Sequence, residues 1–182
     1  MAQRMKTHTD YDFAHVEELQ RVVGGAVTQS ATRRSRITSL AMGAVMLVIA
    51  VLLAVRGSHW GLIGAAGAVA LFFAARAVFY YPFVAFGVMQ GMDKSITGSD
   101  YLLDKSWMLV TNPKGSSQYP YEKCHRLLET EKNLYFIMKS GQGLILDKDN
   151  LKGGTPEELR AWMEKKCGKK AEWLGNVRRS IV

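Results

Sequence analysis

The sequence predicts an α+β membrane protein: an N-terminal helix, a transmembrane helical hairpin, and a small curved antiparallel sheet capped by one C-terminal helix. Three observations support this prediction. Two apolar stretches of about 20 residues, Ile37–Val55 and Trp60–Phe79, are separated by only four residues. From about residue 95 onward, short β-prone runs alternate with turn residues. A well-marked helix start then follows at Thr155.

The two apolar stretches have the length that a transmembrane helix needs. At a rise of 1.5 Å per residue, about 20 residues match a hydrocarbon core of roughly 30 Å. Backbone amides in lipid must be paired within the segment, so residues 37–55 and 60–79 are expected to form two antiparallel helices. A signal peptide is disfavoured because more than 30 residues precede the first span and a second span follows at once. A soluble core hairpin is disfavoured because polar residues stand only at the span ends.

Arginines at the membrane boundary predict the orientation. Arg33, Arg34 and Arg36 precede the first span and Arg76 lies near the end of the second, whereas the connecting loop holds only Arg56. By the positive-inside rule, both termini are expected in the cytoplasm. The four cytoplasmic arginines are the candidate contacts to the membrane surface. Arg76 either binds a lipid headgroup or extends along its alkyl stem to the interface.

The net charge of +8 is spread along the chain. Residues 1–36 hold six Lys and Arg against four acidic residues, and residues 80–182 hold sixteen against twelve. A basic excess beside a membrane suits anionic lipids. Nucleic acid is not expected as a partner, because no basic stripe is interleaved with aromatic residues. Cys124 and Cys167 lack a metal-ligand spacing and are interpreted as ordinary reduced thiols.

The segment before the hairpin is expected to contain a helix. Residues 1–36 form a cytoplasmic segment whose amphipathic helix spans residues 10–29, is capped by Asp10 or Asp12, and packs against the cytoplasmic domain. The alternative, a helix lying on the bilayer, is disfavoured by its acidic polar side.

Residues 80–94 form a connector in which Pro82 ends or kinks the second helix. The apolar remainder of the connector, broken by two glycines, runs along the interface or under the next domain.

Small residues in the second span predict close helix contact. Gly64 and Ala68 have the small-xxx-small spacing that lets helix backbones approach each other. Contact within the hairpin needs no second copy, but a homo-oligomer fits the same pattern.

The cytoplasmic domain is expected to be an antiparallel meander. Its β-prone runs are separated by turns rich in Asn, Pro, Gly and Lys. The runs are Ser106–Thr111, Arg126–Thr130, Leu134–Met138 and Leu144–Leu146.

One helix closes the meander, and a basic tail follows it. Thr155 is the expected N-cap, Pro156 fits the first helical position, and Glu158 completes a capping box. The basic tail, residues 169–182, is either disordered or a Trp-bearing contact with the membrane surface.

Residue patterns typical of catalysis or of metal binding are weak. The series His8, Asp10, Asp12 and His15 lacks a recognised metal-ligand spacing. Glu129 is expected to be solvated. No catalytic residue, cofactor or metal site is therefore predicted, and the protein is expected not to be an enzyme.

Five motifs of the cytoplasmic region, in this order and spacing, resemble the YcxB-like family of bacterial membrane proteins. They are YPYEK at 119–123, LLET at 127–130, NLYF at 133–136, GLILDK at 143–148 and TPEEL at 155–159. The resemblance covers about residues 100–166 and the placement of the hairpin, and departs at Asp147, where the family usually has proline. It implies a pleckstrin-homology-like (PH-like) cytoplasmic domain over residues 95–168, an inner-membrane location and no catalytic residues. Lipid binding does not follow from such a resemblance.

These observations favour a non-enzymatic integral membrane protein that presents a small cytoplasmic domain to a partner. The partner is expected to be either another protein or the anionic lipids of the bilayer itself. The alternative is a role centred on the hairpin, as a subunit of a membrane assembly or as an immunity-type protein.

Overall fold

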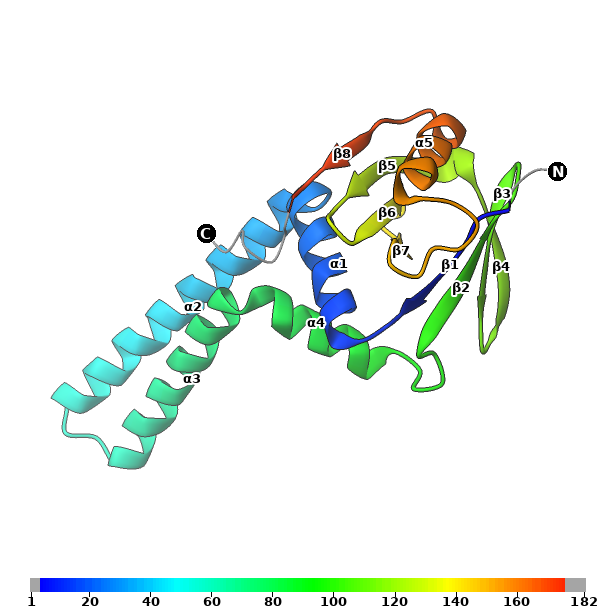
Figure 1. Ribbon diagram of the computed structural model, residues 1–182. Coiled ribbons are helices and arrows are strands. Elements are labelled where there is room, and N and C mark those ends of the chain that lie inside the picture. The colour runs from blue at the N-terminus through cyan, green and yellow to red at the C-terminus, as the bar shows by residue number, and fades with distance from the viewer. Residues whose placement is uncertain (1–3, 176–182) are drawn as a thin grey trace.

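A computed structural model describes residues 4–175, in which five α-helices and two four-stranded sheets confirm the predicted α+β class (Figure 1). The helices are α1 (Phe13–Ala26), α2 (Gln29–Val55), α3 (Trp60–Val78), α4 (Tyr80–Gly91) and α5 (Pro156–Cys167), with a 3-10 turn, η1, at Tyr121–Lys123. The strands are β1 (Lys6–Asp10), β2 (Gly98–Leu103), β3 (Trp107–Asn112), β4 (Gly115–Pro120), β5 (Cys124–Glu129), β6 (Asn133–Met138), β7 (Gly143–Asp147) and β8 (Ala171–Trp173).

The strands form two sheets instead of the single bent meander of the prediction. The first sheet has the order β1-β2-β3-β4 and is antiparallel throughout. The second has the order β7-β6-β5-β8, with β8 parallel to β5. Side chains from both sheets and from α5 share one core, in which Tyr101, Phe136 and Leu159 are fully buried.

Helix α1 covers the other face of the second sheet, as predicted for the amphipathic helix. Val22 of α1 packs in a second apolar cluster with Tyr135 and Ile137 of β6. Glu18 of α1 accepts a hydrogen bond of 2.7 Å from the buried Tyr135 hydroxyl. Burial on both faces explains why every residue of β6 is buried. Asp12 caps α1 by accepting a 2.7 Å hydrogen bond from the backbone amide of His15.

Strand β1 ties the start of the chain into the same domain as the C-terminal half. It precedes the hairpin in sequence, yet it pairs along its whole length with β2, which follows the hairpin. Its inward side chains are polar, and the Thr9 hydroxyl donates a 2.8 Å hydrogen bond to the carbonyl of Ile145 on β7. Both ends of the hairpin therefore enter one folded unit.

Helices α2 and α3 are long and apolar enough to cross a membrane. In each helix, only 17% of an apolar stretch of 18 residues is buried inside the structure. Their contact is made by small residues: a Cβ added to Gly43 would meet the Ala70 carbonyl oxygen at 3.3 Å. The buried positions of α3 include Ala66 and Ala70, whereas Gly64 and Ala68 of the predicted small-residue pair are exposed. Helix α2 also begins eight residues before the predicted span, at Gln29.

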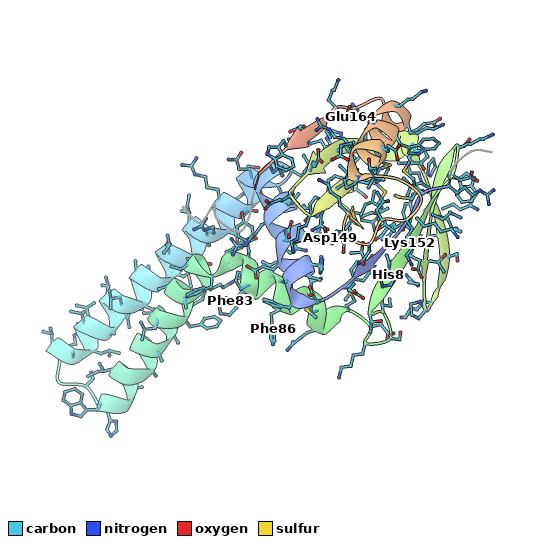
Figure 2. All side chains as sticks on the ribbon, in the orientation of Figure 1. His8, Phe83, Phe86, Asp149, Lys152 and Glu164 are labelled. Carbon is cyan, nitrogen blue, oxygen red and sulfur yellow. The ribbon has the colours of Figure 1, made fainter. Side chains whose placement is uncertain are left out.

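Helix α4 leaves α3 at a sharp turn. Phe79 ends α3 and precedes the first residue of α4, with Pro82 in the first turn of the new helix. The two glycines expected to break this connector, Gly87 and Gly91, lie within α4. Phe83 and Phe86 project from α4 on the side away from the sheets (Figure 2).

Helix α5 begins as the sequence predicts. The Thr155 hydroxyl accepts a bond from the Glu158 amide, and the Glu158 carboxylate accepts one from the Thr155 amide, which completes the capping box. The start of the expected basic tail forms β8 and follows a left-handed Gly168. The rest of the tail, residues 176–182, lies outside the described residues.

Candidate functional site

The hairpin carries a cleft at its domain-side end, between α2 and α3. Its volume is about 380 Å³. Two of the four predicted arginines, Arg34 and Arg76, line it although they are 42 positions apart in sequence. Helix α2 also contributes Ala31, Ser35, Thr38, Ser39 and Met42, and α3 contributes Phe73.

The cleft is positively charged and has unused hydrogen-bond donors. Arg34 and Arg76 are both exposed, and within residues 4–175 neither side chain has an ion-pair or hydrogen-bond partner. No acidic residue is among the residues that line the cleft. A guanidinium carries five N–H donors in a planar fork that suits phosphate oxygens. The cleft is therefore suited to an anionic group that accepts several hydrogen bonds.

Hydroxyl groups and two apolar side chains complete the cleft. Thr38 donates a 2.9 Å hydrogen bond to the carbonyl of Arg34, so its oxygen keeps lone pairs that accept bonds. Ser39 is buried on the side of α2 that faces α3. Met42 and Phe73 line the cleft nearer the centre of the hairpin. The lining changes from charged to apolar along the helices, as a phospholipid does from its phosphate to its acyl chains.

The other two predicted arginines lie outside the cleft. Arg36 donates from Nε to the carbonyl of Ala77 at 3.1 Å, which satisfies a backbone oxygen in the last turn of α3 and ties the two helices together. Arg33 is exposed and is not among the lining residues.

Sequence reasoning found the arginines but missed the groups beside them. Arg34, Thr38 and Met42 follow one another at intervals of four, which places them on one face of α2. Phe73 and Arg76 are three apart on α3. This spacing was visible in the sequence, but choosing the face required knowing which sides of the two helices meet.

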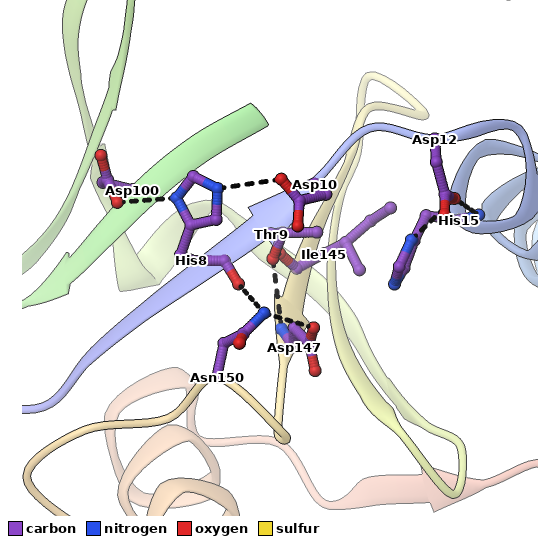
Figure 3. A network of polar contacts seen from close by, with 9 residues as sticks. All are labelled: His8, Thr9, Asp10, Asp12, His15, Asp100, Ile145, Asp147 and Asn150. Atoms are coloured by element: carbon purple, nitrogen blue, oxygen red, sulfur yellow. Dashed lines mark hydrogen bonds and ion pairs between the residues drawn. The ribbon is translucent and has the colours of Figure 1, made fainter. Parts of the chain in front are cut away.

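The histidine and aspartate series near the N-terminus does not form one cluster (Figure 3). His8 lies between two carboxylates, with Nδ1 2.8 Å from Asp100 and Nε2 3.2 Å from Asp10. Asp12 and His15 form a separate pair at the start of α1. Within residues 4–175 no three potential ligands gather as a metal site.

Both ring nitrogens of His8 face acceptors, an arrangement that suits the protonated imidazolium. The hydrogen bond to Asp100 raises the pKa of His8, with a smaller contribution from Asp10, against the opposing effect of burial. The hollow beside His8 is lined by Lys6 and Lys152 as well as by Asp100, so its charge is mixed.

Residues 103–163 match the family described as YcxB-like protein. This segment of the chain, below called the YcxB-like segment, is therefore similar to that family. It runs from the last residue of β2 into α5 and contains the five motifs, so the resemblance is confirmed there. The hairpin and the arginine cleft lie outside the match. No curated protein matches the chain.

A buried ion network lies inside the YcxB-like segment and corrects the expectation that Glu129 is solvated. The Glu129 side chain is 7% exposed and accepts a 2.6 Å hydrogen bond from the Lys148 ammonium, which is 8% exposed. Lys148 also donates to the Thr130 carbonyl at 2.7 Å and lies over the ring of Trp173, 5.5 Å from its centroid. The second carboxylate oxygen is 3.4 Å from Arg160. These contacts hold the β5–β6 turn, the chain after β7 and strand β8 together.

The two free cysteines are neighbours in space. Cys124 opens β5 in the YcxB-like segment, and Cys167 ends α5. The interaction between the two thiols lowers the pKa of Cys124 and raises that of Cys167, while the Cys124 thiol donates to the Arg126 carbonyl at 3.5 Å.

Proposed function

We propose that the protein is a non-enzymatic integral membrane protein whose hairpin crosses the inner membrane and whose folded domain lies on the cytoplasmic side. The pairing of β1 with β2 supports this, because it requires both ends of the hairpin to be on the same side of the membrane. The exposed apolar surface of the hairpin also supports it. Such a surface would be an aggregation site in water but is the expected surface of a helix in lipid.

The function that this geometry supports best is recognition of an anionic phospholipid in the cleft between α2 and α3. The observation that carries the proposal is the pair of unpartnered guanidiniums, Arg34 and Arg76, in one cleft with apolar side chains. The phosphate would accept bonds from the guanidiniums and the acyl chains would lie along Met42 and Phe73. The bound lipid would fix the hairpin relative to the YcxB-like domain, which is thereby presented to a protein partner. Two sheets closed by a C-terminal helix also fit a PH-like fold.

Lipid titration of the full-length chain in detergent, read by native mass spectrometry, tests this function. We expect phosphatidylglycerol to bind more tightly than phosphatidylcholine. The double variant Arg34→Gln/Arg76→Gln should weaken phosphatidylglycerol binding by about 10- to 30-fold, because each phosphate contact contributes on the order of 1 kcal/mol.

Arg33→Gln is the matched control for the single variant Arg34→Gln, since each removes one positive charge from α2 and only Arg34 lines the cleft. Its effect should stay below about threefold, because an exposed charge is screened by salt. An equal loss in the control, or no preference for phosphatidylglycerol, would show that the cleft is not a lipid site.

The alternative role, centred on the hairpin, is favoured by one observation. Gly64 and Ala68 leave a small-residue face of α3 exposed, which allows close approach of another transmembrane helix. Crosslinking from native membranes with full-length and spans-only proteins discriminates the two roles. A partner retained by the spans alone would place the function in the hairpin.

A further inference from the structure

Helix α4 has two different faces. Towards the domain it is closely packed: Ala85 is fully buried, and a Cβ added to Gly24 of α1 would fall 2.7 Å from the ring of Tyr81. On the other face, Phe83 and Phe86 are 40% and 57% exposed. They are three positions apart and form one exposed apolar stripe.

The stripe continues the apolar surface of the hairpin. Helix α4 begins one residue after Phe79, the C-cap of α3. The ring of Phe83 meets Phe72 of α3 edge-on, with 6.1 Å between the centroids. In Figure 2 the Phe83 and Phe86 side chains project from the side of α4 towards which the hairpin extends, and the domain lies on the other side.

We propose that α4 is an in-plane membrane anchor, with Phe83 and Phe86 inserted into the interfacial layer of the bilayer. The proposal rests on the proposed function, because it requires that the hairpin crosses the membrane. A bilayer is favoured over a protein as the occupant because the stripe is continuous with the apolar surface of α3. Aromatic side chains on one face of a helix are typical of segments that lie in the interface.

This placement explains how the domain is oriented on the membrane. Helix α4 has 12 residues, a length of about 18 Å, and α1 packs directly on it. An anchored α4 would hold α1 and the sheets at a fixed height above the bilayer. Arg76 lies in the last turn of α3, so the arginine cleft would stand at the depth of the phosphate groups.

Photocrosslinking of the full-length chain in phosphatidylglycerol and phosphatidylcholine nanodiscs tests the anchor. The photoreactive phenylalanine analogue p-benzoylphenylalanine replaces Phe86 in one variant, Leu47 in the middle of α2 in a second, and Gln118 on the exposed edge strand β4 in a third. Mass spectrometry then identifies what each probe has captured. We expect lipid adducts at positions 86 and 47 and none at position 118.

The controls separate the failure of the anchor from the failure of the proposed function. Lipid adducts at position 47 without any at position 86 would overturn the anchor alone. A crosslink from position 86 to a second copy of the chain, in place of lipid, would overturn it as well. If position 47 also fails to capture lipid, the hairpin does not cross the bilayer, and both proposals are overturned.

Discussion

The hydroxyl of Thr9 on β1 donates a 2.8 Å hydrogen bond to the carbonyl of Ile145 on β7, and so joins the two sheets across the hairpin insertion. The same oxygen accepts a 3.2 Å bond from the Asp147 amide. Thr9 is completely buried, and Thr7 makes a parallel contact with the Asp147 carbonyl. Threonine side chains thus take the place of a neighbouring strand along the edge of β7.

Replacing Thr9 by valine should destabilise the folded domain. The change conserves shape but leaves the Ile145 carbonyl and the Asp147 amide without their buried partner, at a cost of about 1–3 kcal/mol in the free energy of unfolding. Thermal unfolding in detergent measures the effect. Thr97→Val, at an exposed position, is the control and should be nearly neutral. Equal stability of the two variants would mean that β1 does not hold the sheets together.

Breaking the buried ion pair should be more costly. Lys148→Met leaves the Glu129 carboxylate buried beside Arg160 alone, at 3.4 Å, and we expect a loss of about 3 kcal/mol in the free energy of unfolding. The double variant Glu129→Leu/Lys148→Met removes both charges and should recover much of that loss, because it leaves no uncompensated charge in the interior. Chemical denaturation of both variants in detergent gives the comparison. A double variant as unstable as the single one would contradict this account of the network.

The pKa of His8 should be raised above its ordinary value of about 6.5. A raised folded-state pKa stabilises the fold at pH values below 6.5, and this contribution is lost as the pH rises through the folded-state value. The effect on stability is small because the side chain is 45% exposed.

An NMR titration of the His8 ring measures the pKa directly. Asp100→Asn removes the main cause and should bring the value back towards 6.5. A wild-type pKa at or below 6.5 would show that the two carboxylates do not hold the ring protonated.

Much of the helical framework could be predicted from the sequence, because its signals are local. The hairpin follows from two long apolar runs, and the start of α5 follows from Thr155, Pro156 and Glu158. Strand β6 was found from its apolar run, although its burial on both faces was not foreseen.

Four strands were missed, β1, β2, β4 and β8, and for β1 and β8 the reason is a contact distant in sequence. The inward residues of β1 are threonines that bond to β7, so β1 has no apolar alternation to detect. Strand β4 is an edge strand with no buried residue, and the three-residue β8 is held by its pairing with β5. The burial of Glu129 was missed for the same reason, since Lys148 lies 19 residues further along the chain.

The candidate site was predicted in part. Charge near a span end identifies Arg34 and Arg76 but also Arg33 and Arg36, and composition alone does not separate them. The packing of α2 against α3 distinguishes these arginines. It places Arg34 and Arg76 in the cleft, whereas Arg36 caps α3.

Labelling of single cysteines in bacterial spheroplasts, introduced into a variant in which Cys124→Ala and Cys167→Ala remove the two native thiols, tests the central claim most directly. Ser58→Cys lies in the loop between α2 and α3, and Ser117→Cys lies on the exposed strand β4. A membrane-impermeant maleimide should label position 58 in intact spheroplasts and position 117 only after lysis, since the domain and both ends of the hairpin share the cytoplasmic side. Labelling of both positions before lysis, or of position 117 alone, would contradict a hairpin that crosses the membrane with its domain inside.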